Sequence, residues 1–165
     1  MNLEELYDYK SRLMMDICSN EEVVKLLTNN PDAIVPNTQL PYTQVFPFER
    51  VPTETDDAKT FICFDVDVIS VENRTYYIPI IYLWIFTHES MMRTDNGIRI
   101  DRISSALDKH LNGNRFYTLG ELELDTVTRF VPTKTYLGRV VTYVGKEFNR
   151  PSGSKATPNN RRIGK

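Results

Sequence analysis

The sequence predicts an α+β domain with a mainly antiparallel sheet, a long central hairpin and helices packed on one face, in the order α-α-β-β-β-α-β-β. Three observations predict this class. In residues 60–70, apolar side chains on one strand face alternate with Cys63, Asp65 and Asp67 on the other, and this period of two is typical of a half-buried strand. Residues 76–87 continue as an almost wholly apolar strand. Apolar residues recur at helical spacing near residues 3–17 and 100–111, so helices flank this hairpin in the sequence.

Two helices are expected before the first strand. The positions at helical spacing in the first helix are Leu3, Leu6, Lys10, Leu13, Met14 and Ile17. Ser19 followed by Glu22 has the pattern of a capping box and predicts a second helix over residues 21–27. Residues 31–44 contain three prolines and few periodic apolar positions, which predicts a long surface connection.

The first strand is expected within residues 45–51, where Pro47 cannot donate to a neighbour and confines the strand to an edge or a bulge. The long hairpin follows, with its turn at residues 72–75. Pro79 in the second arm of the hairpin indicates another bulge or an unpaired side.

After a polar connection, an amphipathic helix is expected over residues 100–111, ended by Asn112-Gly113 in the left-handed region. Two closing strands are expected over residues 122–130 and 139–144, with their turn between them.

Composition predicts one domain, residues 1–149, followed by a basic C-terminal arm, residues 150–165. The 165 residues are 41% hydrophobic and 25% charged, as in ordinary globular proteins. Residues 151–165 carry four cations and no acid, so a chain of net charge −2 has −6 on its first 150 residues. The arm has almost no apolar residue and cannot fold by itself.

Several classes are disfavoured. Cys18 and Cys63 are expected to be buried thiols, and no Cys/His spacing indicates zinc. The acidic, amphipathic N-terminus is unlike a signal peptide, and the longest apolar run, residues 78–86, is far below the ~20 residues of a membrane helix. We therefore expect a protein that is made or assembled in a cytoplasm and has no membrane partner.

The two histidines do not indicate a metal site. A zincin needs His at positions i and i+4, and the residue four after His88 is Met92. We expect His88 to be a polar residue where a strand leaves the sheet. His110 lies on the apolar stripe of its helix and is expected to be a satisfied core or border residue.

Paired carboxylates leave one enzymatic alternative open. Asp65 and Asp67 share a strand face, with Lys59 and Glu72 nearby, and Mg²⁺-dependent nucleases gather such groups. Alternating acids are equally what a half-buried strand displays. We expect no catalytic, metal or cofactor site.

Two features indicate assembly. The strand at residues 76–86 is apolar on both faces, and a chain this short lacks enough helix to cover both faces of its sheet, so we expect another subunit to cover part of it. The candidate interface residues are Phe46, Phe48, Tyr82, Trp84 and Phe86. The second feature is the arm, whose candidate contact residues are Arg150, Lys155, Arg161, Arg162 and Lys165.

The element order resembles that of the tail terminator and tail-completion (neck) proteins of long-tailed bacteriophages and phage-like tail devices, over about residues 1–148. The segments that carry the resemblance are VFPFERVP, FICFDVDV, YYIPIIYLWIFTHE, GIRIDRISSALDKHL, GELELDTVTRFV and RVVTYVGKEF. The arm lies outside the resemblance.

The resemblance implies a virion protein, assembled in the host cytoplasm as a ring, commonly of six subunits. The ring would cap the tail tube and join it to the neck. Its partners would be further copies of the chain, the tail tube or sheath protein and a neck connector protein. It implies no cofactor and no chemistry. DNA would pass without specific binding, which an acidic lumen would favour.

In such a ring we expect the sheet and the helix at residues 100–111 to pack against a neighbour. The arm would reach an adjacent subunit or ring, where Arg161 and Arg162 meet carboxylates. A head-completion or stopper protein of the same neck remains open as an alternative. A nuclease built on Asp65 and Asp67 and a regulatory module whose basic arm contacts nucleic acid are alternatives from other classes.

Overall fold

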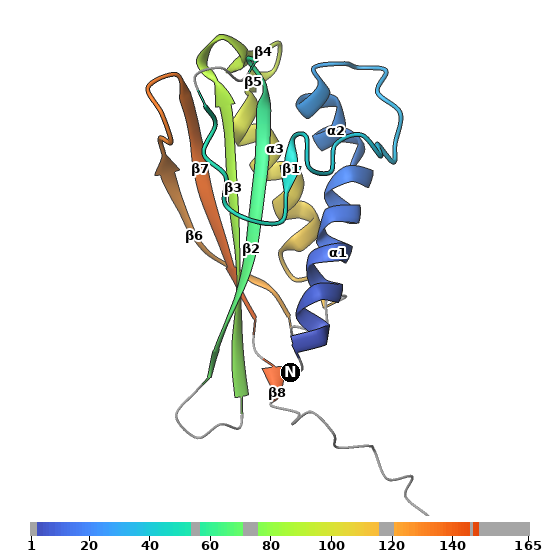
Figure 1. Cartoon of the computed structure of the whole chain (residues 1–165), viewed down its shortest axis with the longest axis vertical. Coiled ribbons are helices and arrows are strands. Elements are labelled where there is room, and N and C mark those ends of the chain that lie inside the picture. Colours follow the sequence, from blue (N-terminus) through green and yellow to red (C-terminus); the bar gives the residue numbers. More distant parts are fainter. Residues whose placement is uncertain (1–2, 54–56, 71–75, 116–120, 146, 149–165) are drawn as a thin grey trace, which may run out of the picture.

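The computed structural model of the chain describes residues 3–53, 57–70, 76–115, 121–145 and 147–148. A twisted sheet forms one layer, and three helices form a second layer on one of its faces (Figure 1). The helices are α1 (Leu3–Ser19), α2 (Glu21–Thr28) and α3 (Arg99–Leu111). This arrangement confirms the α+β class, the order of the main elements and the placement of the helices on one face.

The long β2–β3 hairpin lies at the centre of a sheet with strand order β1-β2-β3-β7-β6, and β8 pairs with the start of β3. The strands are β1 (Val45–Phe46), β2 (Thr60–Ser70), β3 (Tyr76–His88), β6 (Glu123–Phe130), β7 (Tyr136–Val144) and β8 (Glu147–Phe148). Every pair in this sheet is antiparallel except β1 with β2.

The prolines act as the sequence predicts. Strand β1 lies at the sheet edge and ends directly before Pro47. Pro79 lies in β3 just past the end of β7, where its carbonyl oxygen accepts a bond from the Gly145 N–H at 2.9 Å. Because Pro79 bonds on that side only through its carbonyl oxygen, in the gap between the β7 and β8 pairings, its missing N–H breaks no hydrogen bond of the ladder.

Two local details differ from the sequence prediction. The N-cap of α2 is Asn20 and not Ser19, because the Asn20 side chain accepts the Val23 N–H at 3.2 Å. The connection after β3 is not wholly irregular, since it holds a short 3-10 helix and a two-stranded hairpin. These elements are η1 (Glu89–Met91), β4 (Arg93–Thr94) and β5 (Gly97–Ile98). Gly113, at φ +77°, supplies the left-handed residue after α3.

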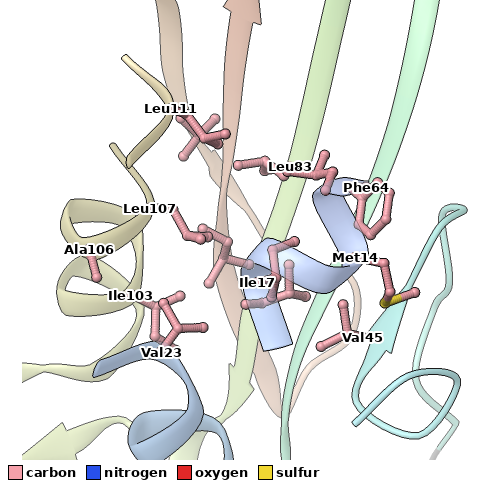
Figure 2. Packing of buried hydrophobic residues seen from close by; sticks show 14 of the residues in the cluster. Met14, Ile17, Val23, Val45, Phe64, Leu83, Ile103, Ala106, Leu107 and Leu111 are labelled. Carbon is pink, nitrogen blue, oxygen red and sulfur yellow. The ribbon is translucent and has the colours of Figure 1, made fainter. Parts of the chain in front are cut away.

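The main core lies between the helices and the sheet, as Figure 2 shows. Met14 and Ile17 of α1 point toward Phe64 of β2 and Leu83 of β3. The α3 stripe lies beside them and consists of Ile100, Ile103, Ala106, Leu107 and Leu111, all buried. This is the stripe that the helical spacing predicts, and it covers the alternating apolar side chains of the sheet.

One buried arginine joins the helix layer together. The Arg99 side chain is 4% exposed and donates to the Leu26 carbonyl, to Asn29 Oδ1 at 2.6 Å and to the Met91 carbonyl at 2.7 Å. These acceptors lie at the end of α2 and in η1, so one guanidinium ties two elements together, and its bond to the Leu26 carbonyl is buried. Burial is the main cause that lowers the Arg99 pKa.

Several sequence predictions lie outside the described residues. They are the hairpin turn at residues 72–75, the domain boundary at residue 149 and the whole basic arm, residues 150–165.

Candidate interaction surface

The face of the sheet that points away from the helices, called here the outer face, holds a second buried cluster. Its members are Phe46, Phe61, Cys63, Phe86 and Tyr136. They lie where β2 begins and β3 ends, in the upper part of Figure 1. The Phe61 and Phe86 ring centroids are 5.5 Å apart, and the Phe86 and Tyr136 rings meet edge-on at 6.1 Å.

The chain covers this second cluster itself. The Arg50 guanidinium lies 4.7 Å from the centroid of the Phe46 ring, and the Cys63 thiol donates to the Arg50 carbonyl at 3.9 Å. The Tyr136 hydroxyl donates to the Asp57 carbonyl at 3.0 Å. The connection between β1 and β2 therefore crosses the outer face here, which is the return path that a parallel β1–β2 pair requires.

The rest of the outer face is not closed by described residues. Ile69 is 52% exposed, and Ile78, Ile80, Tyr82 and Trp84 are partly exposed. We call these five residues the open patch. The Tyr82 and Trp84 rings stack with centroids 5.7 Å apart and an interplanar angle of 22°. Asp65 and Asp67 of β2 lie directly opposite Tyr82 and Ile80 on this face, so the patch combines aromatic and aliphatic side chains with two acids at its border. Exposed aromatic side chains of this kind are enriched at protein interfaces.

The sequence-predicted interface residues separate into two groups. Phe46 and Phe86 lie within the second cluster and are covered by their own chain. Tyr82 and Trp84 belong to the open patch, and Phe48 is 46% exposed beside the Phe46 ring. The predicted arm contacts, Arg150, Lys155, Arg161, Arg162 and Lys165, lie outside the described residues.

The two strand aspartates have different surroundings. Asp65 Oδ1 lies 2.5 Å from Lys10 Nζ and accepts the Val66 N–H at 2.7 Å, whereas Asp67 is exposed. Lys59 lies at the start of β2, 3.8 Å from Asp57, and Glu72 is outside the described residues. In the part of the chain that the structure describes, no group of three or more His, Cys, Asp or Glu side chains could hold a metal ion.

The histidines occupy structural positions. His88 is the last residue of β3, and its Nδ1 accepts the Ser90 N–H at 3.2 Å, which confirms a polar residue where the strand leaves the sheet. His110 Nε2 lies 3.3 Å from Asp16 Oδ2, which places this histidine at the α3–α1 border, but the residue is exposed and is not part of the buried stripe of α3.

Both cysteines are free and buried, as the sequence predicts. Burial raises the pKa of Cys18 and of Cys63 to about 11. A thiol with so high a pKa is scarcely ionised at neutral pH, so neither residue is suited to act as a nucleophile.

Sequence reasoning missed a second exposed apolar surface, on α1. Tyr7, Met15 and Tyr42 are 76%, 68% and 65% exposed. They line a groove of about 290 Å³ with Met14 and Pro47, which we call the α1 groove. A signal existed, because Tyr7 and Met15 are eight residues apart and share one side of the helix.

Among the described helices, none combines the length and apolar character needed to cross a bilayer.

Comparison with protein families gives one finding. A family model described as YomW matches residues 20–144, about three quarters of the chain, from the N-cap of α2 to the end of β7. Comparison with curated proteins gives no match.

Proposed function

The chain belongs to the YomW family, which is phage-associated, and we propose that it is a structural subunit of a phage tail or neck ring. The ring would cap the tail tube and join it to the head–tail connector. It would be part of the virion and would be assembled from copies of this chain, commonly six, in the host cytoplasm. DNA would pass through it without specific binding.

The open patch carries this proposal. Strand β3 is the central strand of the sheet, and its outer face keeps Tyr82 and Trp84 partly exposed after the chain has covered Phe86. A lone subunit would leave this apolar surface in water, and burying it against a partner gains about 25 cal/mol per Å². A structural subunit uses such a surface for assembly.

The α1 groove supplies a second surface of different shape. A closed ring needs each subunit to present two different complementary patches, one for each neighbour. The open patch lies on the outer face of the sheet, whereas Tyr7 and Met15 belong to a helix on the other face. Two unlike apolar surfaces on different sides of one subunit are suited to head-to-tail contacts.

The test is the mass of the full chain, alone and mixed with tail-tube protein, across a concentration series. We expect the wild type to form a closed oligomer and to bind the end of the tube. Tyr82→Arg should lower the mass and abolish binding to the tube, because it places a charge in the open patch. Ile34→Arg is the matched control, since Ile34 is 81% exposed in a loop and lies outside the open patch.

Two outcomes would contradict the proposal. A wild-type chain that stays monomeric at high concentration and binds no tail component would refute the ring. An oligomer that binds the connector but never the tail tube would assign the protein instead to the head-completion or stopper role. Circular dichroism of Tyr82→Arg establishes that any loss of mass is not a loss of fold.

A further inference from the structure

One row of register partners crosses the outer face from β2 to β6. It consists of Asp67, Ile80, Val144 and Glu123, and we call it the outer row. Directly opposed residues of neighbouring strands lie on the same face of a sheet. Leu122, one position before Glu123, is buried in the core on the helix side, which agrees with this placement. Ile80 and Val144 are partly exposed and both acids are exposed, so the row has an apolar middle and an acid at each end.

The two acids of the outer row are unmatched among the described residues. Neither Asp67 nor Glu123 has an ion pair with another described residue, whereas Asp65 in the next row is held by Lys10. The described strand positions beside the open patch on this face include no Lys or Arg; they are Cys63, Asp65, Thr126, Thr128, Val140 and Thr142. Neighbouring strands lie about 4.8 Å apart, so three strand spacings separate the two carboxylates by about 14 Å. A basic partner would complement this face.

The sequence of the basic arm holds the matching pattern with the opposite charge. Arg161, Ile163 and Lys165 occupy alternate positions, and alternate residues of an extended segment share one side. Four residues of extended chain place Arg161 and Lys165 about 13 Å apart. Ile163, between them, is the only large aliphatic residue in the sequence of the arm. A base, an apolar residue and a base therefore match the spacing and the chemistry of the outer row.

We propose that residues 161–165 of a second copy lie extended across the outer row. Arg161 and Lys165 pair with its two carboxylates, and Ile163 packs on its apolar middle beside the open patch. The contact combines two charge pairs with burial of apolar surface. This inference rests on the proposed ring, in which the arm of each subunit lies on the open patch of its neighbour and the contact repeats head to tail.

The direction of β8 favours the arm of a second copy over the arm of the same subunit. Glu147 pairs with Tyr77 and Phe148 with Tyr76, so the chain runs along β8 toward the start of β3. Ile80 of the outer row lies in the opposite direction along β3. The chain therefore passes Phe148 heading away from its own outer row. Residues 149–160 span up to about 40 Å when extended, which is enough to reach an adjoining subunit.

The test uses two full-length variants with reversed charges, read by sedimentation velocity over a concentration series. The arm variant carries Arg161→Glu and Lys165→Glu, and the row variant carries Asp67→Lys and Glu123→Lys. Each variant alone should associate roughly tenfold or more weakly than the wild type, because both attractive pairs become repulsive. An equimolar mixture should recover the association, since each arm then meets an outer row of opposite charge on the other variant.

The control for net charge is Arg93→Glu combined with Lys134→Glu, at two exposed positions outside the outer row, and it should associate as the wild type does. Thermal unfolding of each variant separates weak association from loss of fold. Three outcomes would overturn the inference: an arm variant that associates as the wild type does, a mixture as weak as its two components, or variants that associate more strongly than the wild type, which would place the arm on its own subunit.

Failure of this inference is distinguishable from failure of the proposed function. If the arm variant still forms the ring and Tyr82→Arg does not, the arm contact is refuted and the ring stands. A wild type that stays monomeric would refute both.

Discussion

Gly138 of β7 is the position at which a single methyl group should damage this fold most. It lies in register between Phe86 of β3 and Phe130 of β6. A Cβ built on Gly138 would collide with the Ile85 carbonyl oxygen and would lie 2.6 Å from Phe86 Cβ and 2.8 Å from Phe86 Cα. Rotation of a side chain cannot relieve these contacts, because the carbonyl oxygen and Cα are backbone atoms and Cβ is fixed to Cα.

The expected cost follows from that geometry. Overpacking a core commonly costs about 1–3 kcal/mol, and we expect Gly138→Ala to lower the free energy of unfolding by about 3 kcal/mol because β3 itself must move. For a chain of 165 residues this corresponds to a fall in Tm of roughly 6–12 °C. Phe86 and Phe130, whose ring centroids are 5.8 Å apart, should lose their packing as the strands separate.

Urea denaturation followed by the fluorescence of Trp84, the single tryptophan, measures this effect. Gly113→Ala is the matched control. Gly113 has φ +77° but nothing within 4 Å of a built Cβ, so it tests backbone strain without steric contact and should cost only about 1–2 kcal/mol. If Gly138→Ala were as stable as the control, close packing of β7 on β3 would not be what requires glycine.

Three further predictions concern buried or capping groups. Arg99→Met should lower the free energy of unfolding by about 3 kcal/mol in the same urea assay, because three acceptors lose their donor. Arg99→Lys should recover only part of the lost stability. At pH 8, Cys18 and Cys63 should react with a thiol reagent about a hundredfold more slowly than thiols with the unperturbed pKa of 9.0. Their reaction rates should rise about tenfold per pH unit toward pH 11. Equal rates in the native and the denatured protein would contradict this prediction. Asn20→Ala should cost about 1 kcal/mol through loss of the α2 cap, whereas Ser19→Ala should be nearly neutral.

Side-chain periodicity carried most of the fold prediction. The apolar residues of α3 recur with the period of a helix, and those of β2 recur with the period of a strand. The structure confirms the helix and the strand that these periods predict. Pro47 and Pro79 also acted locally, because a missing N–H limits a strand wherever the rest of the chain lies.

The errors came from contacts between distant residues. The second cluster was not foreseen, because nothing in the local pattern around Phe86 shows that Arg50 and the residues after β1 return over the outer face. The same return makes β1 parallel to β2. That another subunit covers part of the apolar strand stays a prediction, and part of its outer face is covered by its own chain.

The amino-acid sequence by itself determined the class of the fold, the order of its elements and the strand that would carry the surplus apolar surface, because these depend on spacing along the chain. Only the tertiary structure decided which of those apolar residues stay partly exposed, such as Tyr82, and which are covered by their own chain, such as Phe86. The physical reason is that exposure and charge pairing depend on what lies across space from a residue. That neighbour is chosen by the fold as a whole.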